Sequence, residues 1–125
     1  MLPGETVGDV EAEIAQLLDR CRAADPALVV ASRTLLHRPP LETDPDEPIV
    51  RALGRTVGSV RRRPAEVGGM SYWADSAFLS ARGIPTVLFG PGGEGAHADV
   101  EWVSLTDTVD CARILTRTAL DFFRG

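Results

Sequence analysis

Apolar residues recur at the three- and four-residue spacing of an amphipathic helix in three stretches of the chain. The first stretch follows Thr6, which together with Asp9 has the residue types of a helix N-terminus. The second begins at Pro48, a residue suited to the first position of a helix, and the third begins at Ser104 or Thr106. The residues expected to face a core are Val7, Val10, Ile14, Leu17, Leu18 and Cys21 in the first helix, Val50, Leu53, Val57 and Val60 in the second, and Val109, Ala112, Leu115, Ala119, Leu120 and Phe123 in the third.

Two apolar runs without that spacing are predicted to be strands. One is ALVVASRTLLH at residues 27–37, and the other is IPTVLF at residues 84–89. The second run is apolar and bounded by glycines, as in a central strand that is covered on both faces. A brief helix closed by Gly83 is predicted just before it, within residues 74–83. Helix and strand therefore alternate in the second part of the chain, which predicts an α/β fold.

A proline-rich segment, RPPLETDPDEP at residues 38–48, divides these elements into two groups. Its prolines lack backbone donors and fix the chain direction, so the segment can pair with nothing regular. We take it as the domain boundary, with one part at residues 1–44 and the other at residues 45–125.

The charge balance narrows the choice of partners. Thirteen basic and eighteen acidic residues give a net charge of −5, which repels phosphate backbones and anionic lipid. Nucleic acid and membrane surfaces are therefore not expected partners, and the short cluster Arg61–Arg63 is interpreted as a solvated entry to a strand. No apolar run approaches the roughly 20 residues that span a bilayer, and no secretory signal is visible, which predicts a cytoplasmic protein. Cys21 and Cys111 are expected to be buried free thiols.

A glycine-rich loop, GPGGEGAH at residues 90–97, follows the second predicted strand. In open α/β sheets, ligands bind beyond the carboxyl ends of the strands, which is where this loop is expected to lie. Gly92 and Gly93 permit close approaches that side chains would block, so that backbone amides can face a ligand. The Lys and Ser/Thr of a phosphate-binding loop are missing, and nucleotide binding is therefore disfavoured.

His97 ends this loop and is its one side chain suited to bind a transition metal, because a neutral imidazole nitrogen keeps a lone pair. Asp99 and Glu101 could orient such a ring. The residues alone leave His97 open between a metal ligand and a hydrogen-bonded loop residue. The other histidine, His37, is interpreted as a loop residue.

Three segments in this order, LPGET, RPPLETDPDEPIVRAL and SYWADSAFLSARGIPTVLFGPGGEGAHADVEWV, resemble the C-terminal half of a family of metallopeptidases. This family includes acetylornithine deacetylase, succinyl-diaminopimelate desuccinylase, aminoacylase and carboxypeptidase G. The likeness covers nearly the whole chain. Its most specific part combines the aspartate of WAD, the GIPTVLFGPG strand and loop, and a histidine with a glutamate four residues later.

The resemblance implies a hydrolase of amide bonds in N-acyl amino acids or short peptides that uses two metal ions, commonly zinc. It implies that His97 binds one of these metals. Asp75 matches an aspartate near the substrate cleft, and a buried helix-capping role is an equal alternative. No residue of this chain is expected to be catalytic. The residues expected near the substrate or behind the metal ligand are Asp75, Gly92, Gly93 and Glu101.

The other ligands and the general base of such enzymes have no counterpart here. The only HxD triplet is HAD at His97, and the sequence contains no Glu-Glu pair. By the resemblance, residues 1–44 are the second half of a small α+β lid domain, and residues 45–125 are the C-terminal part of a two- or three-layered α/β catalytic domain. We therefore expect a truncated chain that is inactive alone and that forms a homodimer or pairs with a complementing N-terminal half. Two alternatives stay open, a non-catalytic dimerisation or interaction module and a small-ligand binder derived from the same fold.

Overall fold

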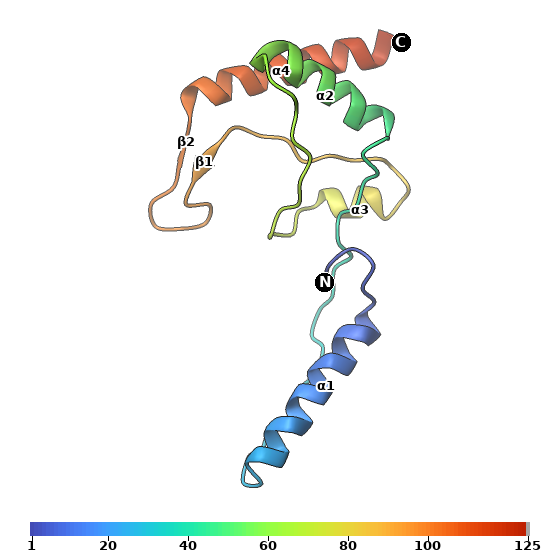
Figure 1. The fold of residues 1–125 in the computed structure, drawn as a ribbon, viewed down its shortest axis with the longest axis vertical. Helices are drawn as coiled ribbons and strands as arrows, with labels where there is room; N and C mark the ends of the chain where they lie inside the picture. Colours follow the sequence, from blue (N-terminus) through green and yellow to red (C-terminus); the bar gives the residue numbers. More distant parts are fainter. Residues whose placement is uncertain (125) are drawn as a thin grey trace.

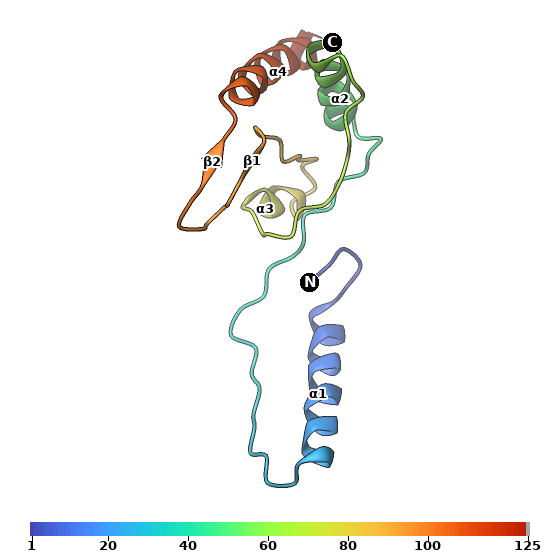
Figure 2. The same ribbon diagram turned by 60° about the vertical axis from the view of Figure 1, so that its left-hand side comes forward.

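Helices dominate residues 1–124, which are the residues that the computed structural model describes (Figure 1). A long helix stands apart at the N-terminus, and the other helices gather with a small hairpin at the opposite end (Figures 1 and 2). We call residues 1–37 the N-terminal arm and residues 48–124 the C-terminal unit. The elements are α1 (Val7–Ala24), α2 (Pro48–Arg61), α3 (Ser76–Ser80), β1 (Gly93–Glu94), β2 (Trp102–Val103) and α4 (Leu105–Arg124).

Helix α1 begins where the sequence predicts. The Thr6 hydroxyl accepts a hydrogen bond from the Asp9 amide at 3.2 Å, and the Asp9 carboxylate accepts one from the Thr6 amide at 2.9 Å. This reciprocal capping box satisfies backbone donors that have no partner within the helix. The expected buried face is wrong, however, because α1 contains no buried residue. Cys21 is likewise exposed, not buried.

The segment 27–37 turns back along α1 (Figure 2). The Arg22 guanidinium donates to the carbonyl of Val30 at 2.9 Å, and the Thr34 hydroxyl donates to the carboxylate of Glu11. The predicted strand is wrong here, because this stretch has no strand assignment and no ladder partner within residues 1–124. An apolar run can favour an extended backbone, but a strand exists only where a second strand pairs with it.

The proline-rich segment is attached to α3 and to Trp73, which lies three residues before α3. The guanidinium of Arg38 lies 5.5 Å from the ring centre of Trp73 and 5.4 Å from that of Phe78. These two rings meet edge to face at 5.1 Å, and the Trp73 indole donates to the carbonyl of Pro39 at 3.0 Å. The chain that joins the N-terminal arm to the C-terminal unit is therefore held in place by contacts of Arg38 and Pro39 with Trp73 and Phe78.

The core of the C-terminal unit lies between α2 and α4. Leu53 and Val57 of α2 pack against Ile114 of α4, which is fully buried. Helix α2 buries the predicted Leu53 and Val57 positions and, in addition, Ala52 and Thr56. Cys111 is buried, as expected.

The predicted inward face of α4 is wrong. Its buried residues are Cys111, Ile114 and Thr118, whereas the predicted residues Val109, Ala112, Leu115, Ala119, Leu120 and Phe123 are exposed. The position of α2, which periodicity does not reveal, decides which face of α4 is covered.

Residues 84–89 do not form the expected strand covered on both faces. Val87 and Phe89 pack against the core, while Leu88 between them is exposed. The segment is therefore extended with one covered face, and no strand within residues 1–124 pairs with it. Gly83 before it has φ +75°, and the short helix α3 that Gly83 follows is confirmed.

The basic cluster Arg61–Arg63 is not the entry to a strand. Arg61 is the last residue of α2, and Arg62 ends the helix with φ +54° in the left-handed region. The side chain of Arg61 is only 17% exposed, so it is not solvated as predicted. No helix within residues 1–124 is long and apolar enough to cross a membrane.

Candidate functional site

The glycine-rich loop becomes one side of a small antiparallel hairpin. Gly93 pairs with Val103 and Glu94 pairs with Trp102, and the Ser104 amide extends the pairing with a 2.8 Å hydrogen bond to the carbonyl of Gly92. A Cβ atom on Gly93 would lie 2.2 Å from the Trp102 carbonyl oxygen. Glycine is therefore required at position 93 by the close approach of two backbones.

His97 lies in the turn at the tip of this hairpin. The Ala98 amide donates to the carbonyl of Gly95 at 2.8 Å, which closes the turn. His97 is exposed and has φ +65°, a backbone conformation that residues other than glycine adopt infrequently. A glycine at position 97 would adopt this backbone conformation with less strain, yet the residue there is a histidine.

The acidic residues around His97 are also exposed. Asp99 and Glu101 occupy the arm of the hairpin that returns to β2, and Glu94 lies on β1. None of them makes a side-chain hydrogen bond or ion pair to His97 within residues 1–124. Their predicted role of orienting the ring stays a prediction.

Asp75 occupies the N-cap position of α3. Its carbonyl accepts a hydrogen bond from the Phe78 amide at 2.9 Å, but its carboxylate makes no capping hydrogen bond. The side chain is exposed, so the alternative of a buried helix-capping role is wrong. The hairpin and α3 both lie on the side of the α2 and α4 pair that faces the N-terminal arm (Figures 1 and 2).

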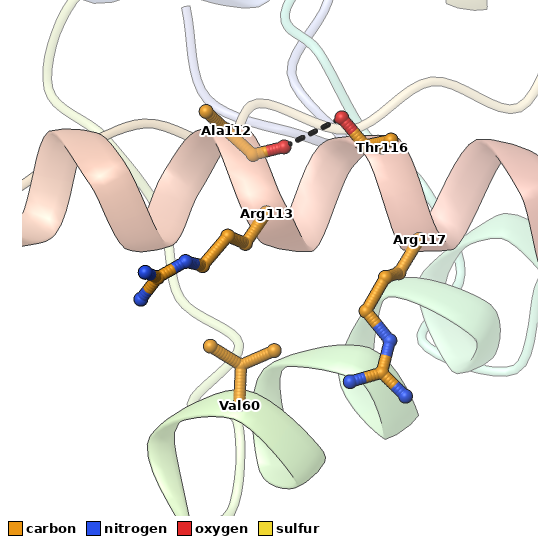
Figure 3. Close-up of a pocket in the computed structure, with 5 residues that line it drawn as sticks. All are labelled: Val60, Ala112, Arg113, Thr116 and Arg117. Atoms are coloured by element: carbon orange, nitrogen blue, oxygen red, sulfur yellow. Dashed lines mark hydrogen bonds between the residues drawn. The ribbon is translucent and has the colours of Figure 1, made fainter.

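A groove on the C-terminal unit lies away from these residues. It measures about 540 Å³ and lies between α2 and α4 (Figure 3). Arg113 and Arg117 reach from α4 toward α2 on either side of Val60 (Figure 3), while the Thr116 hydroxyl donates to the carbonyl of Ala112 at 2.8 Å. None of the residues that line it belongs to the predicted site.

The sequence does not reveal that Arg61 and Asp107 meet at the base of the hairpin. The Asp107 carboxylate in the first turn of α4 accepts a hydrogen bond from the Gly92 amide at 3.3 Å, and it lies 3.4 Å from the Arg61 guanidinium. The Ser104 hydroxyl accepts from the Asp107 amide at 3.2 Å. The spacing of Ser104 and Asp107 signals a helix cap, but nothing local signals the contact with Gly92.

Residues 5–121 match the peptidase family M20/M25/M40. The chain belongs to this family. It is 30% identical over 133 aligned positions to the N-formyl-4-amino-5-aminomethyl-2-methylpyrimidine deformylase of Bacillus subtilis, with 96% of this chain and 30% of that protein covered. It is 31% identical over 75 positions to an uncharacterised metallohydrolase of Methanocaldococcus jannaschii, with 60% of this chain and 18% of that protein covered.

A second relative, from Methanococcus maripaludis, is also named as an uncharacterised metallohydrolase. It is 29% identical to this M20/M25/M40 chain over 73 positions, with 58% of this chain and 18% of that protein covered. The chain thus spans less than a third of the length of each of these relatives. No solved structure gives a significant match.

The metal cofactor that the family implies is not held by the described residues on their own. Within residues 1–124, no three His, Cys, Asp or Glu side chains come together as a metal-binding group. Structural zinc sites use four protein ligands and catalytic ones three, whereas the hairpin offers one imidazole. The described residues therefore do not make up a metal-binding group by themselves.

Proposed function

We propose that this chain supplies one part of a zinc-dependent hydrolase that cleaves amide bonds in N-acyl amino acids or short peptides. His97 is the ligand that it contributes, and the other ligands and the general base come from residues outside this chain. The chain alone is therefore inactive. The similar Bacillus subtilis protein is named as a deformylase of an N-formyl compound, and the loss of a formyl group from nitrogen is the cleavage of an amide bond.

One observation carries this proposal, namely the exposed imidazole of His97 at the tip of the hairpin with a positive φ. A strained conformation costs on the order of 1 kcal/mol or more, and it persists where the surrounding structure enforces it. Exposure leaves the ring nitrogens open to an incoming metal, since a neutral imidazole binds zinc through a lone pair. Asp75, Gly92, Gly93 and Glu101 are the residues that we propose lie near the substrate or support the ligand.

The test uses the two histidines of the chain as separate reporters. Zinc is titrated while the imidazole resonances of His97 and His37 are followed by NMR, and hydrolysis of acetylated and formylated amino acids is assayed in parallel. We expect weak binding that shifts His97, is lost in His97→Ala and remains in the His37→Ala control. We expect no turnover by the chain alone. Efficient turnover by the chain alone, or zinc shifts confined to His37, would overturn the proposal.

The division of the chain follows from the same proposal. We propose that residues 1–44 are half of a small α+β lid domain and that residues 45–125 are the C-terminal part of a layered α/β catalytic domain. The support is the change from an arm without buried residues in α1 to a unit with its own core at Leu53, Val57 and Ile114. The segments 27–37 and 84–89 have no ladder partner within residues 1–124, so their backbone groups are available for pairing with another chain.

A second candidate function is an interaction module that forms a homodimer or pairs with a complementing N-terminal half. The observation that favours it is the exposure of apolar side chains in the N-terminal arm, where Val29 is 97% exposed and Leu35 is 76% exposed. Backbone without a ladder partner is a template for strand addition. Light scattering of the purified chain across a concentration range tests it, since a strict monomer contradicts the homodimer.

A further inference from the structure

The hairpin that carries His97 contains few interactions of its own that could keep it ordered. Its ladder is two residues long, and both strands are exposed. An isolated two-stranded hairpin is at best marginally stable in water, even when it is longer than this one. The orientation of His97 therefore depends on how the base of the hairpin is fixed.

Three elements meet at that base. Gly92 precedes β1, and its amide donates to the Asp107 carboxylate of α4 at 3.3 Å. The other carboxylate oxygen of Asp107 lies 3.4 Å from Nη2 of Arg61, at the end of α2. Both ends of the hairpin are held there, because the amide of Ser104 donates to the carbonyl of Gly92 at 2.8 Å.

The identity of residue 92 fits this arrangement. A Cβ atom on Gly92 would lie 2.6 Å from Oδ2 of Asp107, so any other residue would push the carboxylate away from the amide. Asp107 also departs from the usual behaviour of an acid three residues after a helix cap. Such an acid commonly bonds back to the cap amide, whereas here the amide of Ser104 is taken by Gly92 and the carboxylate turns to the loop.

Arg61 holds the carboxylate from the other side. Its side chain is 17% exposed and that of Asp107 is 36% exposed, so their attraction is less screened by water than that of a surface pair. The Nε and Nη2 atoms of Arg61 are buried and make no hydrogen bond within residues 1–124, which leaves Asp107 as the charge that compensates the guanidinium. Arg61 and Asp107 therefore depend on each other.

We propose that Asp107, backed by Arg61, is a positioning residue that clamps the hairpin at Gly92 and so sets the direction of the His97 imidazole. The inference deepens the proposed function and rests on it for the meaning of His97, but the clamp is measurable without metal or substrate. Neither Arg61 nor Asp107 touches a reacting group in this scheme. Their role is to hold the backbone to which the ligand is attached.

The test compares two carboxylates one turn apart on α4. Asp107→Ala removes the clamp, and the matched control Asp110→Ala removes a similar pair, in which Arg113 lies 3.3 Å from Asp110 and no loop is involved. Amide hydrogen exchange and ¹⁵N relaxation are measured by NMR for residues 92–104, with the amides of Leu53 and Ile114 as a reference for the core. In Asp107→Ala we expect exchange at the Gly92 amide to rise about three- to tenfold, as for one lost hydrogen bond, with a more mobile His97.

A purely structural role would show a different pattern. In that case core exchange would rise with hairpin exchange, and Asp110→Ala would have the same effect on His97, and either result would overturn the proposal. Asp107→Asn keeps an oxygen that can accept from Gly92, so it should restore most of the hairpin order that Asp107→Ala loses. Failure of that rescue would also count against the clamp.

Two further variants cover the case in which Asp107→Ala unfolds because Arg61 is left as an uncompensated charge. The double variant Arg61→Met, Asp107→Ala removes both charges, and Gly92→Ala disturbs the contact from the loop side. Both should loosen His97 while the core stays protected, and an unchanged His97 in both overturns the proposal. Zinc shifts at His97 in the unaltered chain decide the proposed function separately, since they are read without any change to the clamp.

Discussion

Helices α1 and α4 have similar sequence patterns, but α1 is exposed and α4 is partly buried. They have 18 and 20 residues, and both repeat apolar residues at helical spacing. Helix α4 buries Cys111, Ile114 and Thr118 against the rest of the C-terminal unit, whereas α1 buries nothing. Periodicity therefore predicts that a helix forms, but it does not tell which apolar stripe is covered, or whether any is.

The two helices must accordingly draw their stability from different sources. Helix α1 has its capping box and an ion pair of 2.7 Å between Arg22 and Asp19, an interaction worth only a few tenths of a kcal/mol at an exposed site. Helix α4 has a packed core around Ile114. Most of the stability of a helix in a protein comes from tertiary packing of its apolar face, so we expect α1 to open more readily than α4.

Replacing an isoleucine by alanine should lower the free energy of unfolding much more in α4 than in α1, and this is the largest effect that we expect. Ile114→Ala leaves a cavity at a fully buried position and should cost about 2–5 kcal/mol of the free energy of unfolding. Ile14→Ala removes a side chain that is 41% exposed and should cost about 1 kcal/mol or less. Urea denaturation followed by circular dichroism measures both. Equal costs would contradict the difference between the two helices, because they would show that α1 is packed in solution.

Much of the helical structure could be predicted from sequence, because helix ends are local signals. Thr6 with Asp9 and the proline at position 48 mark two of the three long helices correctly. Residues 27–37 and 84–89 were wrongly predicted to be strands, because strand formation depends on pairing with a distant partner that an apolar run does not reveal. For the site, the glycine loop pointed to His97. Arg61 and Asp107 were missed because their contact joins residues that are far apart in the sequence.

The hairpin and the N-terminal arm also differ, because only the hairpin has paired backbone within residues 1–124. The hairpin of the C-terminal unit is paired, and Gly93→Ala would force a Cβ atom to within 2.2 Å of the Trp102 carbonyl oxygen. We expect a local cost of about 1–3 kcal/mol, seen as loss of amide protection from Gly93 to Val103. Gly69→Ala is the matched control, because a Cβ atom there meets nothing within 4 Å. If both variants leave the hairpin protected, its pairing is not as close as described.

Substitution of Arg38 should weaken the contacts that hold the segment between the N-terminal arm and the C-terminal unit. Arg38→Met removes the charge that lies over Trp73 and Phe78, which is worth about 0.5–1 kcal/mol at an exposed site. We expect faster exchange of the Trp73 indole proton, which is bonded to Pro39, while the indole proton of Trp102 stays unchanged. Arg33→Met, in the N-terminal arm, serves as the control. An unchanged Trp73 signal would mean that the arm is not anchored through Arg38.

The smallest effect concerns the pH dependence of α1. The hydroxyl and backbone hydrogen bonds from Thr6 lower the pKa of Asp9 in the folded chain. A carboxyl group whose pKa is lowered by folding stabilises the folded form at pH values above its unfolded pKa, and this contribution is lost as the pH falls through the folded value. The first turn of α1 should therefore fray as the pH falls below about 4, the ordinary range of an aspartate. The ¹³Cα shifts of Val7 to Glu11 measure this fraying. Asp9→Asn should remove that pH dependence. Thr6→Ala removes the hydroxyl but keeps the backbone donor, so it should move the pKa of Asp9 part of the way back toward its ordinary range. An unaltered titration in Thr6→Ala would show that α1 lacks even this local source of stability.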